Sequence, residues 1–351
     1  MVNKQTVSGE ELLHQRLFSM LCEEIYNGKY SDGSRLPSER ELAEQHGLSR
    51  VTVRKTLETM EADGLVDRLQ GHGTRVRLLR RGYPGSLAIV AVLAPVQNPF
   101  FSAFMRAFES KAEGHDCLVV LKQTSPQWPL DRLPLRFFQR GIRNLVVWPY
   151  DETLDAALLE RARGIGINMV LFDRVVDSPT VDCVSVDNRD AIATLLALLQ
   201  RAGHRRIAYA GWDTTVLSSN SEREQAFLEA GGDPRTVIRL PWRRETAVET
   251  EVAEALKHFQ GKDFPDAFLC ANGNIGIAIS KLLRNAAPGK TAVVSVDDLP
   301  QAELLGMTVY AQPMERMAEA VFERLTRQNA HPASWKGTAL RFKGGLVEHT
   351  A

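Results

Sequence analysis

Cysteine is scarce in this sequence of 351 residues. The four cysteines, Cys22, Cys117, Cys183 and Cys270, lie far apart, with no Cys-x-x-Cys pair and no histidine at the spacing of a metal site. Disulfide frameworks and structural zinc sites use cysteines that recur at close spacing. We therefore expect reduced, buried thiols and neither a metal nor any other cofactor.

Long apolar runs are also missing. The longest stretch, residues 87–96, is far shorter than the roughly 20 residues that cross a bilayer. Residues 1–6 lack the apolar character of a signal peptide. We expect a cytoplasmic protein with no membrane partner.

Neither sign of charge is in excess, since 43 Lys and Arg residues balance 43 Asp and Glu residues. The overall composition therefore gives no net positive charge that would indicate a nucleic-acid partner. Positive charge is concentrated locally instead: residues 68–81 contain five arginines and no acid. Such a patch is enough to contact phosphates, because ionic screening limits electrostatics to about 10 Å.

Signatures of catalysis are missing as well. The sequence has no His-Glu-x-x-His and no Gly-x-Ser-x-Gly motif. Residues 289–291 (Gly-Lys-Thr) look like the end of a phosphate-binding loop, but the position of its first glycine is Arg284. We expect no catalytic residues and no enzymatic activity.

What the sequence does contain is a pair of short helices near its N-terminus. Ser38 with Glu41 fits a capping box for a helix over residues 38–46, which Gly47 would end. Ser49 would cap a second helix that ends near residues 63–64. The apolar residues Val53, Leu57 and Met60 recur on one face of that helix. The opposite arc holds Arg50, Val51, Arg54 and Lys55. Two short helices, a tight turn and exposed cations predict a helix-turn-helix that enters a DNA groove.

Two alternating segments, residues 65–69 and 74–78, flank a Gly-His-Gly tip and predict a two-stranded wing. An earlier helix, from residue 8 to about 27, would pack beneath the helix-turn-helix, because four apolar residues recur on one of its faces: Leu13, Leu17, Leu21 and Ile25. We expect residues 1–79 to form a winged helix-turn-helix DNA-binding domain. Residues 80–86, with two glycines and a proline, predict a linker.

Strand-like and helix-like segments alternate after the linker. The predicted strands are 87–94, 117–122, 144–148, 167–172, 183–186, 206–210, 236–239, 267–271, 291–296, 307–310 and 338–343. The predicted helices are 101–113, 154–163, 188–202, 220–230, 246–259, 274–285 and 314–327. This alternation predicts parallel sheets with helices on both faces. The strands are too many for one small sheet, so we expect an α/β fold of two lobes, with a crossover between residues 173 and 182.

Ligands of open α/β sheets bind beyond the carboxyl ends of the strands. Polar and aromatic residues follow several predicted strands: residues 98–101, Trp148, Asp173, Arg174, Trp212, Asp213, Asn272 and Asp297. Stacking rings combined with carboxylates, amides and a guanidinium suit a small polyhydroxylated ring. Arg223, on the helix after Trp212, could clamp two hydroxyls or a carboxylate.

Other interpretations stay open for some of these positions. Asp187 and Asn188 stand where a helix starts and fit helix caps better than ligand groups. Trp148 and Trp212 fit a hydrophobic core as well as a ligand pocket. His72, on the predicted wing tip, could enter a DNA groove, although an exposed turn is the commoner place for such a histidine.

The stretch over residues 35–77 resembles the winged helix-turn-helix of GntR-type transcription regulators. The resemblance lies in Leu-Pro-Ser-Glu-Arg-Glu-Leu-Ala at 36–43, Leu-Ser-Arg-Val-Thr-Val-Arg at 48–54, and the tip at 71–74. It implies DNA contacts by Arg40, Arg50 and Arg54 and a close approach of the wing at Gly71. Val51 replaces a hydroxyl residue often found there, which leaves Thr52 and Lys55 for base contacts. The predicted DNA-binding residues are Arg40, Ser49, Arg50, Thr52, Arg54, Lys55, Gly71, His72 and Arg75.

Residues 86–351 resemble the periplasmic-binding-like sensor of LacI/GalR-type regulators. The matching motifs include Asn-Pro-Phe-Phe at 98–101, Phe-Asp-Arg at 172–174, Val-Asp-Asn at 186–188, Cys-Ala-Asn at 270–272 and Val-Ser-Val-Asp-Asp at 294–298. The resemblance assigns ligand contact to Phe100, Asp173, Arg223, Asn272 and Asp297. Together with the strand ends, the predicted effector-binding residues are Phe100, Phe101, Trp148, Asp173, Arg174, Arg223, Asn272 and Asp297. Gly273 departs from the acidic residue usual at that position, which indicates a different ligand specificity.

The two resemblances imply the architecture of arabinose-responsive repressors: a winged helix-turn-helix joined to a two-lobed, periplasmic-binding-protein-like sensor with parallel sheets over residues 87–351. Lobe 1 would comprise about 87–175 and 306–328, and lobe 2 about 180–300 and 329–351.

We expect a homodimeric transcription regulator, a repressor that leaves its double-stranded DNA operator when a sugar or sugar derivative binds. Two alternatives stay open. The ligand could act as a corepressor, as a purine would, or the chain could be a solute receptor or carbohydrate enzyme whose N-terminal module does not read DNA.

Overall fold

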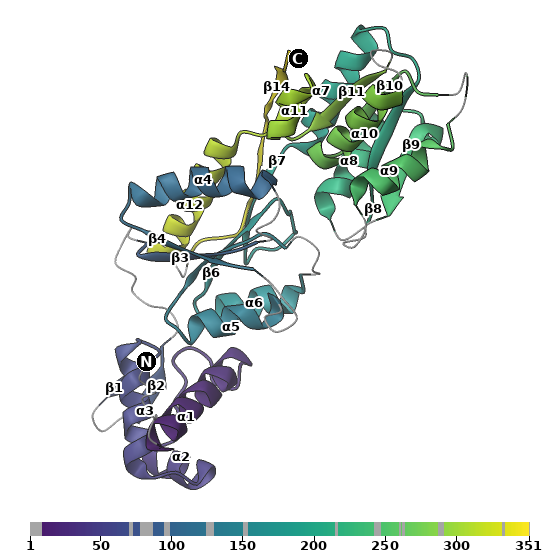
Figure 1. The fold of residues 1–351 in the computed structure, drawn as a ribbon. Helices are drawn as coiled ribbons and strands as arrows, with labels where there is room; N and C mark the ends of the chain where they lie inside the picture. Colours follow the sequence, from purple (N-terminus) through teal and green to yellow (C-terminus); the bar gives the residue numbers. More distant parts are fainter. Residues whose placement is uncertain are drawn as a thin grey trace, which may run out of the picture.

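The computed structural model describes residues 9–69, 73–77, 87–94, 99–123, 130–149, 154–214, 217–241, 247–259, 261, 264–286, 291–331 and 334–350. Figure 1 shows a small helical domain at the N-terminus, followed by two lobes in which helices flank a sheet. Among the described residues, no helix combines the length and the apolar character needed to cross a membrane.

The N-terminal domain consists of α1 (Gly9–Tyr26), α2 (Glu39–His46), α3 (Arg50–Ala62) and a hairpin of β1 (Val66–Leu69) and β2 (Gly73–Val76). The predicted caps form its turns. Ser38 Oγ accepts the N–H of Glu41, and Glu41 Oε2 accepts the N–H of Ser38 at 2.7 Å. Gly47 ends α2 with a φ of 62°, a left-handed conformation that glycine adopts without strain.

A small hydrophobic core joins the first and third helices. Leu17, Leu21 and Ile25 of α1 and the predicted stripe of α3 are at most 2% exposed and belong to one cluster. Leu13, which the four-residue repeat places on the same face, is 41% exposed. His14 takes the place facing α3, and its Nδ1 lies 3.1 Å from Thr56 Oγ1.

The sheet of lobe 1 has six strands in the order β13-β7-β6-β5-β3-β4, all parallel. These strands are β3 (Ile89–Leu93), β4 (Leu118–Lys122), β5 (Asn144–Val147), β6 (Asn168–Phe172), β7 (Asp182–Val186) and β13 (Ala339–Phe342). Helices α4 (Pro99–Glu113) and α12 (Met314–Ala330) cover one face, and α5 (Leu133–Phe138) and α6 (Ala156–Gly164) cover the other (Figure 1).

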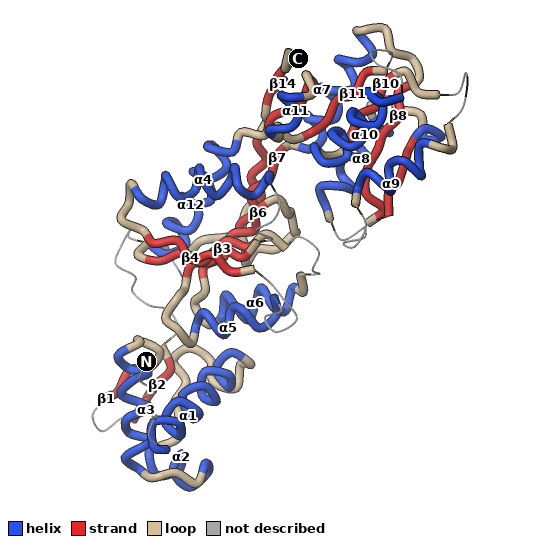
Figure 2. The backbone as a smooth tube through the Cα atoms, in the orientation of Figure 1, coloured by secondary structure: helices blue, strands red, loops and turns tan. Residues whose placement is uncertain are grey.

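The sheet of lobe 2 has the order β14-β12-β11-β10-β8-β9. Its strands are β8 (Ile207–Asp213), β9 (Val237–Pro241), β10 (Ala267–Cys270), β11 (Ala292–Val296), β12 (Thr308–Ala311) and β14 (Gly345–Glu348), which is antiparallel to β12. Helices α7 (Asn188–Arg201) and α8 (Ser218–Glu229) lie on one face, and α9 (Val248–Leu256) and α10 (Gly273–Ala286) on the other. Figure 2 shows the strands of each lobe between its helices.

The chain passes between the lobes after β7, after β12, and again between β13 and β14. The first crossing therefore follows β7 and does not lie at residues 173–182 as predicted, because β7 pairs with β6 in lobe 1. The predicted lobe ranges differ in the same way. Within 306–328, β12 lies in the sheet of lobe 2 and only α12 packs on lobe 1; within 329–351, β13 lies in lobe 1.

Among the described residues, α5, α11 (Pro300–Leu304) and β14 are short elements with no counterpart among the predicted ones. Each has only four to six residues. That length is too short to show a helical or a strand period.

The N-terminal domain packs against lobe 1 through α1. The Tyr26 hydroxyl donates to the carbonyl of Asp131 at 3.3 Å, and Gln139 Nε2 donates to the carbonyl of Ser19 at 3.4 Å. The guanidinium of Arg161 lies 5.7 Å from the centre of the Tyr26 ring. The core of the helical domain is continuous with the hydrophobic layer beneath α5 and α6.

Candidate nucleic-acid interface and ligand pocket

The outer face of α3 carries the cations that the sequence places there. Arg50, Arg54 and Lys55 are exposed, and the neighbouring Val51 is 73% exposed. Thr52 lies elsewhere: it is 7% exposed, and its hydroxyl is 2.8 Å from the hydroxyl of Ser49. Ser49 Oγ also accepts the N–H of Thr52. The two hydroxyl residues thus hold the start of α3, and the cations face outward.

The other predicted DNA contacts come from α2 and the hairpin. Arg40 donates through Nε to Glu44 Oε1 at 2.9 Å, yet its side chain stays 76% exposed. Arg75 on β2 is exposed and donates through Nη1 to the carbonyl of Gly33 at 2.9 Å. Gly71 and His72 lie outside the described residues.

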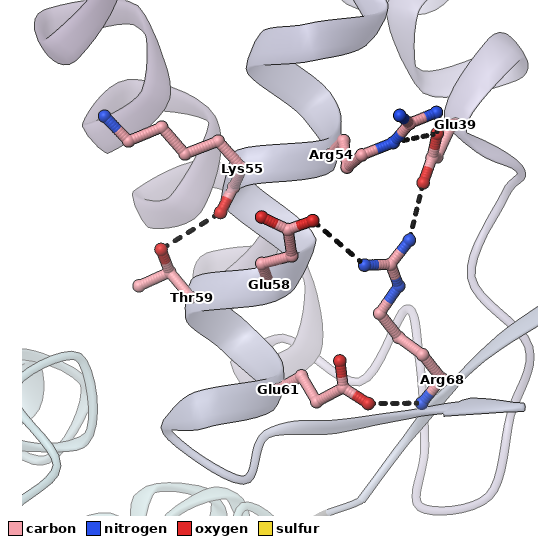
Figure 3. Close-up of polar contacts among 7 residues, drawn as sticks. All are labelled: Glu39, Arg54, Lys55, Glu58, Thr59, Glu61 and Arg68. Atoms are coloured by element: carbon pink, nitrogen blue, oxygen red, sulfur yellow. Dashed lines mark hydrogen bonds and ion pairs between the residues drawn. The ribbon is translucent and has the colours of Figure 1, made fainter.

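Acidic side chains hold two arginines where α2, α3 and β1 meet (Figure 3). Arg54 and Arg68 both donate to Glu39, with N–O distances of 3.1 and 2.7 Å. Glu58 Oε1 lies 3.5 Å from Arg68 Nη1, and Glu61 Oε1 accepts the backbone N–H of Arg68 at 3.3 Å. Arg68, which the sequence marks only as part of a basic stretch, therefore ties the hairpin to both helices.

A pocket lies between the lobes, where strands of both sheets end. Its walls are Phe100, Trp148, Asp173, Trp212, Leu217, Ser219, Asn220, Arg223, Ala271, Asn272, Asn274, Asp297, Leu299 and Gln312. Most of the predicted effector residues are brought together here. The exceptions are Phe101 and Arg174, neither of which lines the pocket.

Aromatic rings form the wall that lobe 1 contributes. Phe100 and Trp148 meet edge to face, with ring centroids 5.4 Å apart. Phe101 lies behind them, 2% exposed, with its ring 5.8 Å from that of Trp148. Arg174 donates through Nη2 to the carbonyl of Pro149 at 2.9 Å. The wall therefore presents a ring for stacking, while Phe101 supports it from the core.

Two carboxylates face the pocket from opposite lobes, and both stand on a left-handed backbone, with φ of 55° at Asp173 and 78° at Asp297. Non-glycine residues adopt this conformation at a cost, and such residues cluster at functional sites. Asp297 Oδ1 accepts a hydrogen bond from Gln312 Nε2 at 2.6 Å. Asp173 Oδ1 is buried without a hydrogen-bond partner among the described residues. Burial raises the pKa of the Asp173 carboxyl to about 7, an effect that Arg223 opposes and Asp297 increases.

Arg223 is fixed by the protein on two of its three nitrogens. Nε donates to Asn188 Oδ1 at 2.7 Å, and Nη1 donates to the carbonyl of Ala271 at 2.6 Å. Asn188 also donates to Glu222 Oε2 at 2.8 Å, and Glu222 accepts from Arg341 of β13 at 2.9 Å. Asp187, by contrast, is the N-cap of α7, as predicted. A chain of polar contacts thus runs from Arg223, on the lobe 2 wall of the pocket, to the sheet of lobe 1.

Asn272 immediately precedes α10, and its Oδ1 accepts the N–H of Ile275 in the first turn at 3.1 Å. At the next position, a Cβ on Gly273 would lie 2.7 Å from Leu299 Cδ1. Leu299 therefore occupies the space that an acidic side chain at position 273 would need.

Several pocket residues escape prediction from the strand ends. Asn220 of α8 holds Trp212 in place, accepting its N–H at 2.9 Å and donating to its carbonyl at 2.7 Å. Gln312 lies at the crossing after β12, and its Oε1 is buried without a partner among the described residues. These residues belong to a helix start and to a crossing, and only the assembled lobes bring them to the strand ends.

Two family profiles match the chain. The profile "Bacterial regulatory proteins, gntR family" matches residues 13–76. The profile "Periplasmic binding protein-like domain" matches residues 196–348. The first range covers the helix-turn-helix and its wing, and the second covers lobe 2 from the middle of α7 onward, together with α12 and β13.

Curated relatives are regulators of transcription. Over 309 residues the chain is 29% identical to the HTH-type transcriptional regulator PtxS of Pseudomonas putida. The aligned region covers 81% of this chain and 87% of that protein. Over 318 residues it is 23% identical to the arabinose metabolism transcriptional repressor of Geobacillus stearothermophilus, with 86% of each chain covered.

Solved structures share the fold of the two lobes. A LacI transcriptional regulator from Rhodococcus superposes with a TM-score of 0.63 at 21% identity, covering 74% of this chain and 96% of that chain. A LacI family transcriptional regulator from Enterococcus faecium, with bound ribose, gives 0.60 at 18% identity, covering 74% and 98%. The chain therefore has a GntR-type helix-turn-helix domain at its N-terminus followed by a periplasmic-binding-like domain, and over most of its length it is similar to curated regulators of transcription.

Proposed function

We propose that the chain is a repressor that binds a DNA operator through α3 and the wing and releases it when a small sugar-like ligand enters the pocket. One observation carries the proposal. A single chain combines a helix with a cationic outer face and a pocket of aromatic rings, carboxylates and amides between two lobes. The first suits the major groove, and the second suits a polyol.

The unsatisfied groups of the pocket indicate the chemistry of the ligand. Asp173 Oδ1 and Gln312 Oε1 are both acceptors, so they favour a ligand that presents hydroxyl donors. Two carboxylates face one guanidinium, which already donates to Asn188 and Ala271. A neutral sugar therefore fits better than a sugar acid or a sugar phosphate, whose negative charge would add to that of the carboxylates.

A homodimer fits the exposed edge of lobe 1. Strand β4 stands at the end of its sheet, and its Leu118, Val120 and Leu121 are 69%, 40% and 44% exposed. Apolar edge strands pair readily with another chain. Pairing of two copies along β4 would present two α3 helices to a twofold-symmetric operator.

Release would follow from movement of the lobes. A ligand that contacts both walls of the pocket favours a closed arrangement, and lobe 1, on which α1 is packed, moves with the closure. The ligand can shift operator affinity only by its different affinity for the two arrangements, typically about 1–3 kcal/mol.

The test begins with thermal unfolding of the full chain against pentoses, hexoses, sugar acids, sugar phosphates and purines. A ligand at 100 times its Kd stabilises the protein by about 2.7 kcal/mol, which is a clear shift of Tm. We expect a hit among the neutral sugars. A hit among the purines instead, or stabilisation only by charged sugars, would contradict the ligand class proposed here.

The ligand that is found is then added to the complex of the protein with a duplex selected from random DNA. Release of the duplex is the expected result. Tighter binding would make the ligand a corepressor, and failure of the protein to select any duplex would remove the proposed DNA-binding function.

A further inference from the structure

The cationic face of α3 is not free of acidic groups. Glu39, the first residue of α2, accepts two hydrogen bonds from Arg54, from Nε at 3.2 Å and from Nη2 at 3.1 Å. Its other oxygen accepts from Arg68 Nη2 at 2.7 Å. Figure 3 shows the two guanidinium groups converging on this one carboxylate.

The position of Glu39 favours the ionised form of its carboxyl group. It lies in the first turn of a helix, where the backbone amides favour an anion, and its side chain is only 19% exposed. Arg68 is 28% exposed and also approaches Glu58, so its charge is used within the domain. Arg54 is 56% exposed and contacts no other acid within ion-pair distance among the described residues.

The two-point contact fixes the plane of the Arg54 guanidinium. Nε and Nη2 form one edge of the group and both face Glu39. The remaining nitrogen, Nη1, forms no hydrogen bond or ion pair within the part of the chain that the structure describes. An arginine whose plane is held in advance loses less freedom when it binds a base edge or a phosphate.

From these contacts we infer that Glu39 is a positioning residue for sequence recognition, acting through Arg54. The inference rests on the proposed DNA-binding function. The carboxylate has opposite effects on two kinds of binding. It repels every phosphate backbone and so weakens binding to DNA of any sequence, while it orients Arg54 and so favours the duplex that matches. Glu39 thereby increases the preference for the matching duplex and lowers the affinity for DNA of any sequence.

The experiment compares two duplexes. The wild-type full chain first selects a duplex from a random pool, and a scrambled version of that duplex is the reference. If the wild type selects nothing, the proposed function fails before the inference is tested. If it does select, Kd is measured on both duplexes for Glu39→Gln over a series of salt concentrations.

For Glu39→Gln we expect the selected duplex to bind at least about fivefold more weakly, the loss typical of one misplaced recognition contact. The scrambled duplex should bind as tightly as before or more tightly, because one negative charge is gone. General damage to the domain would weaken both duplexes, so the opposite directions separate positioning from structure.

Glu58→Gln is the matched control. It removes an acid from α3 that contacts Arg68 and is 57% exposed, but that forms no hydrogen bond or ion pair with Arg54 among the described residues and acts on it only through its charge. In this variant the affinity for both duplexes should rise by the same factor, so the ratio of the two Kd values stays unchanged. If Glu39→Gln behaved in this way too, the inference would be wrong.

Circular dichroism establishes that the variants are folded. Should Glu39→Gln not fold, Glu39→Asp supplies the comparison, because it keeps the charge but withdraws the carboxylate by one methylene. For Glu39→Asp we expect unchanged affinity for the scrambled duplex and a smaller ratio of the affinity for the selected duplex to the affinity for the scrambled one. An unchanged ratio would overturn the positioning role.

Discussion

Asp173 brings to the wall of the pocket a carboxyl whose Oδ1 is buried and whose pKa is raised to about 7. A ligand hydroxyl that donates to this group favours its ionised form, so binding releases a proton and strengthens as the pH rises through 7. Between pH 6 and pH 8 we expect about tenfold tighter binding, measured by calorimetry with the ligand found in the panel. Asp173→Asn should abolish this dependence, and a flat profile in the wild type would contradict the role of the carboxylate.

The same shift has the opposite sign for the stability of the unliganded protein. The pKa in the folded state lies above the ordinary value of 3.8, so the folded state holds the proton more tightly than the unfolded state. This contribution to stability is complete below about pH 4 and is lost as the pH rises through 7.

Arg54 and Asp297 should separate the two activities, because they lie in different domains. Arg54→Ala should weaken binding of the selected duplex by about 5- to 100-fold and leave the ligand-induced rise in Tm unchanged. Asp297→Ala should do the reverse, since it removes a pocket carboxylate that holds Gln312. Fluorescence anisotropy and thermal unfolding measure the two effects. Equal loss of both activities in both variants would show that the roles are not separate.

At this scale the sequence predicts which strand ends meet but not which side chains face the ligand. Phe100 and Phe101 are adjacent, yet only Phe100 lines the pocket. Asp173 and Arg174 divide in the same way, because Arg174 reaches the carbonyl of Pro149. Thr52 lies at the edge of the recognition face by helical spacing but is buried against Ser49. Side-chain direction depends on packing against distant residues, which spacing along the chain does not contain.

Helix α2 depends on its capping box, because Ser38 and Glu41 satisfy amides at its start that have no partner inside the helix. We expect Ser38→Ala to destabilise α2 by about 1 kcal/mol, which corresponds to about fivefold faster hydrogen exchange of its amides. Ser31→Ala, at an exposed serine in the preceding turn, is the control and should leave the exchange rates unchanged. Equal rates in both variants would mean that tertiary packing alone holds the helix.

Helices and strands that are marked by local sequence signals could be predicted, whereas features that depend on pairing with residues far away in the sequence could not. The caps of α2 and α3 and the alternation of long strands and helices are local, so they are visible in the sequence. The places where the chain changes lobe are not local. Strands β7 and β12 have ordinary buried sequences, and only their pairing with β6 and β11 assigns them to a lobe.

The proposed dimer can be tested on the whole molecule. Leu118→Glu places a charge on the exposed edge of β4, so we expect it to convert dimers into monomers in analytical ultracentrifugation. Leu228→Glu alters another exposed leucine, 37% exposed on α8 of lobe 2, and should leave the dimer intact. A Leu118→Glu variant that remains dimeric would place the interface elsewhere.

The two sheets are each completed by a strand from the last part of the sequence, β13 for lobe 1 and β14 for lobe 2. During synthesis, therefore, neither lobe has all the strands of its sheet until residues 339–348 have left the ribosome. The winged helix-turn-helix, complete by residue 76, precedes them by on the order of half a minute at ordinary rates of translation. A nascent chain thus completes its winged helix-turn-helix well before either sheet of the two lobes gains its last strand.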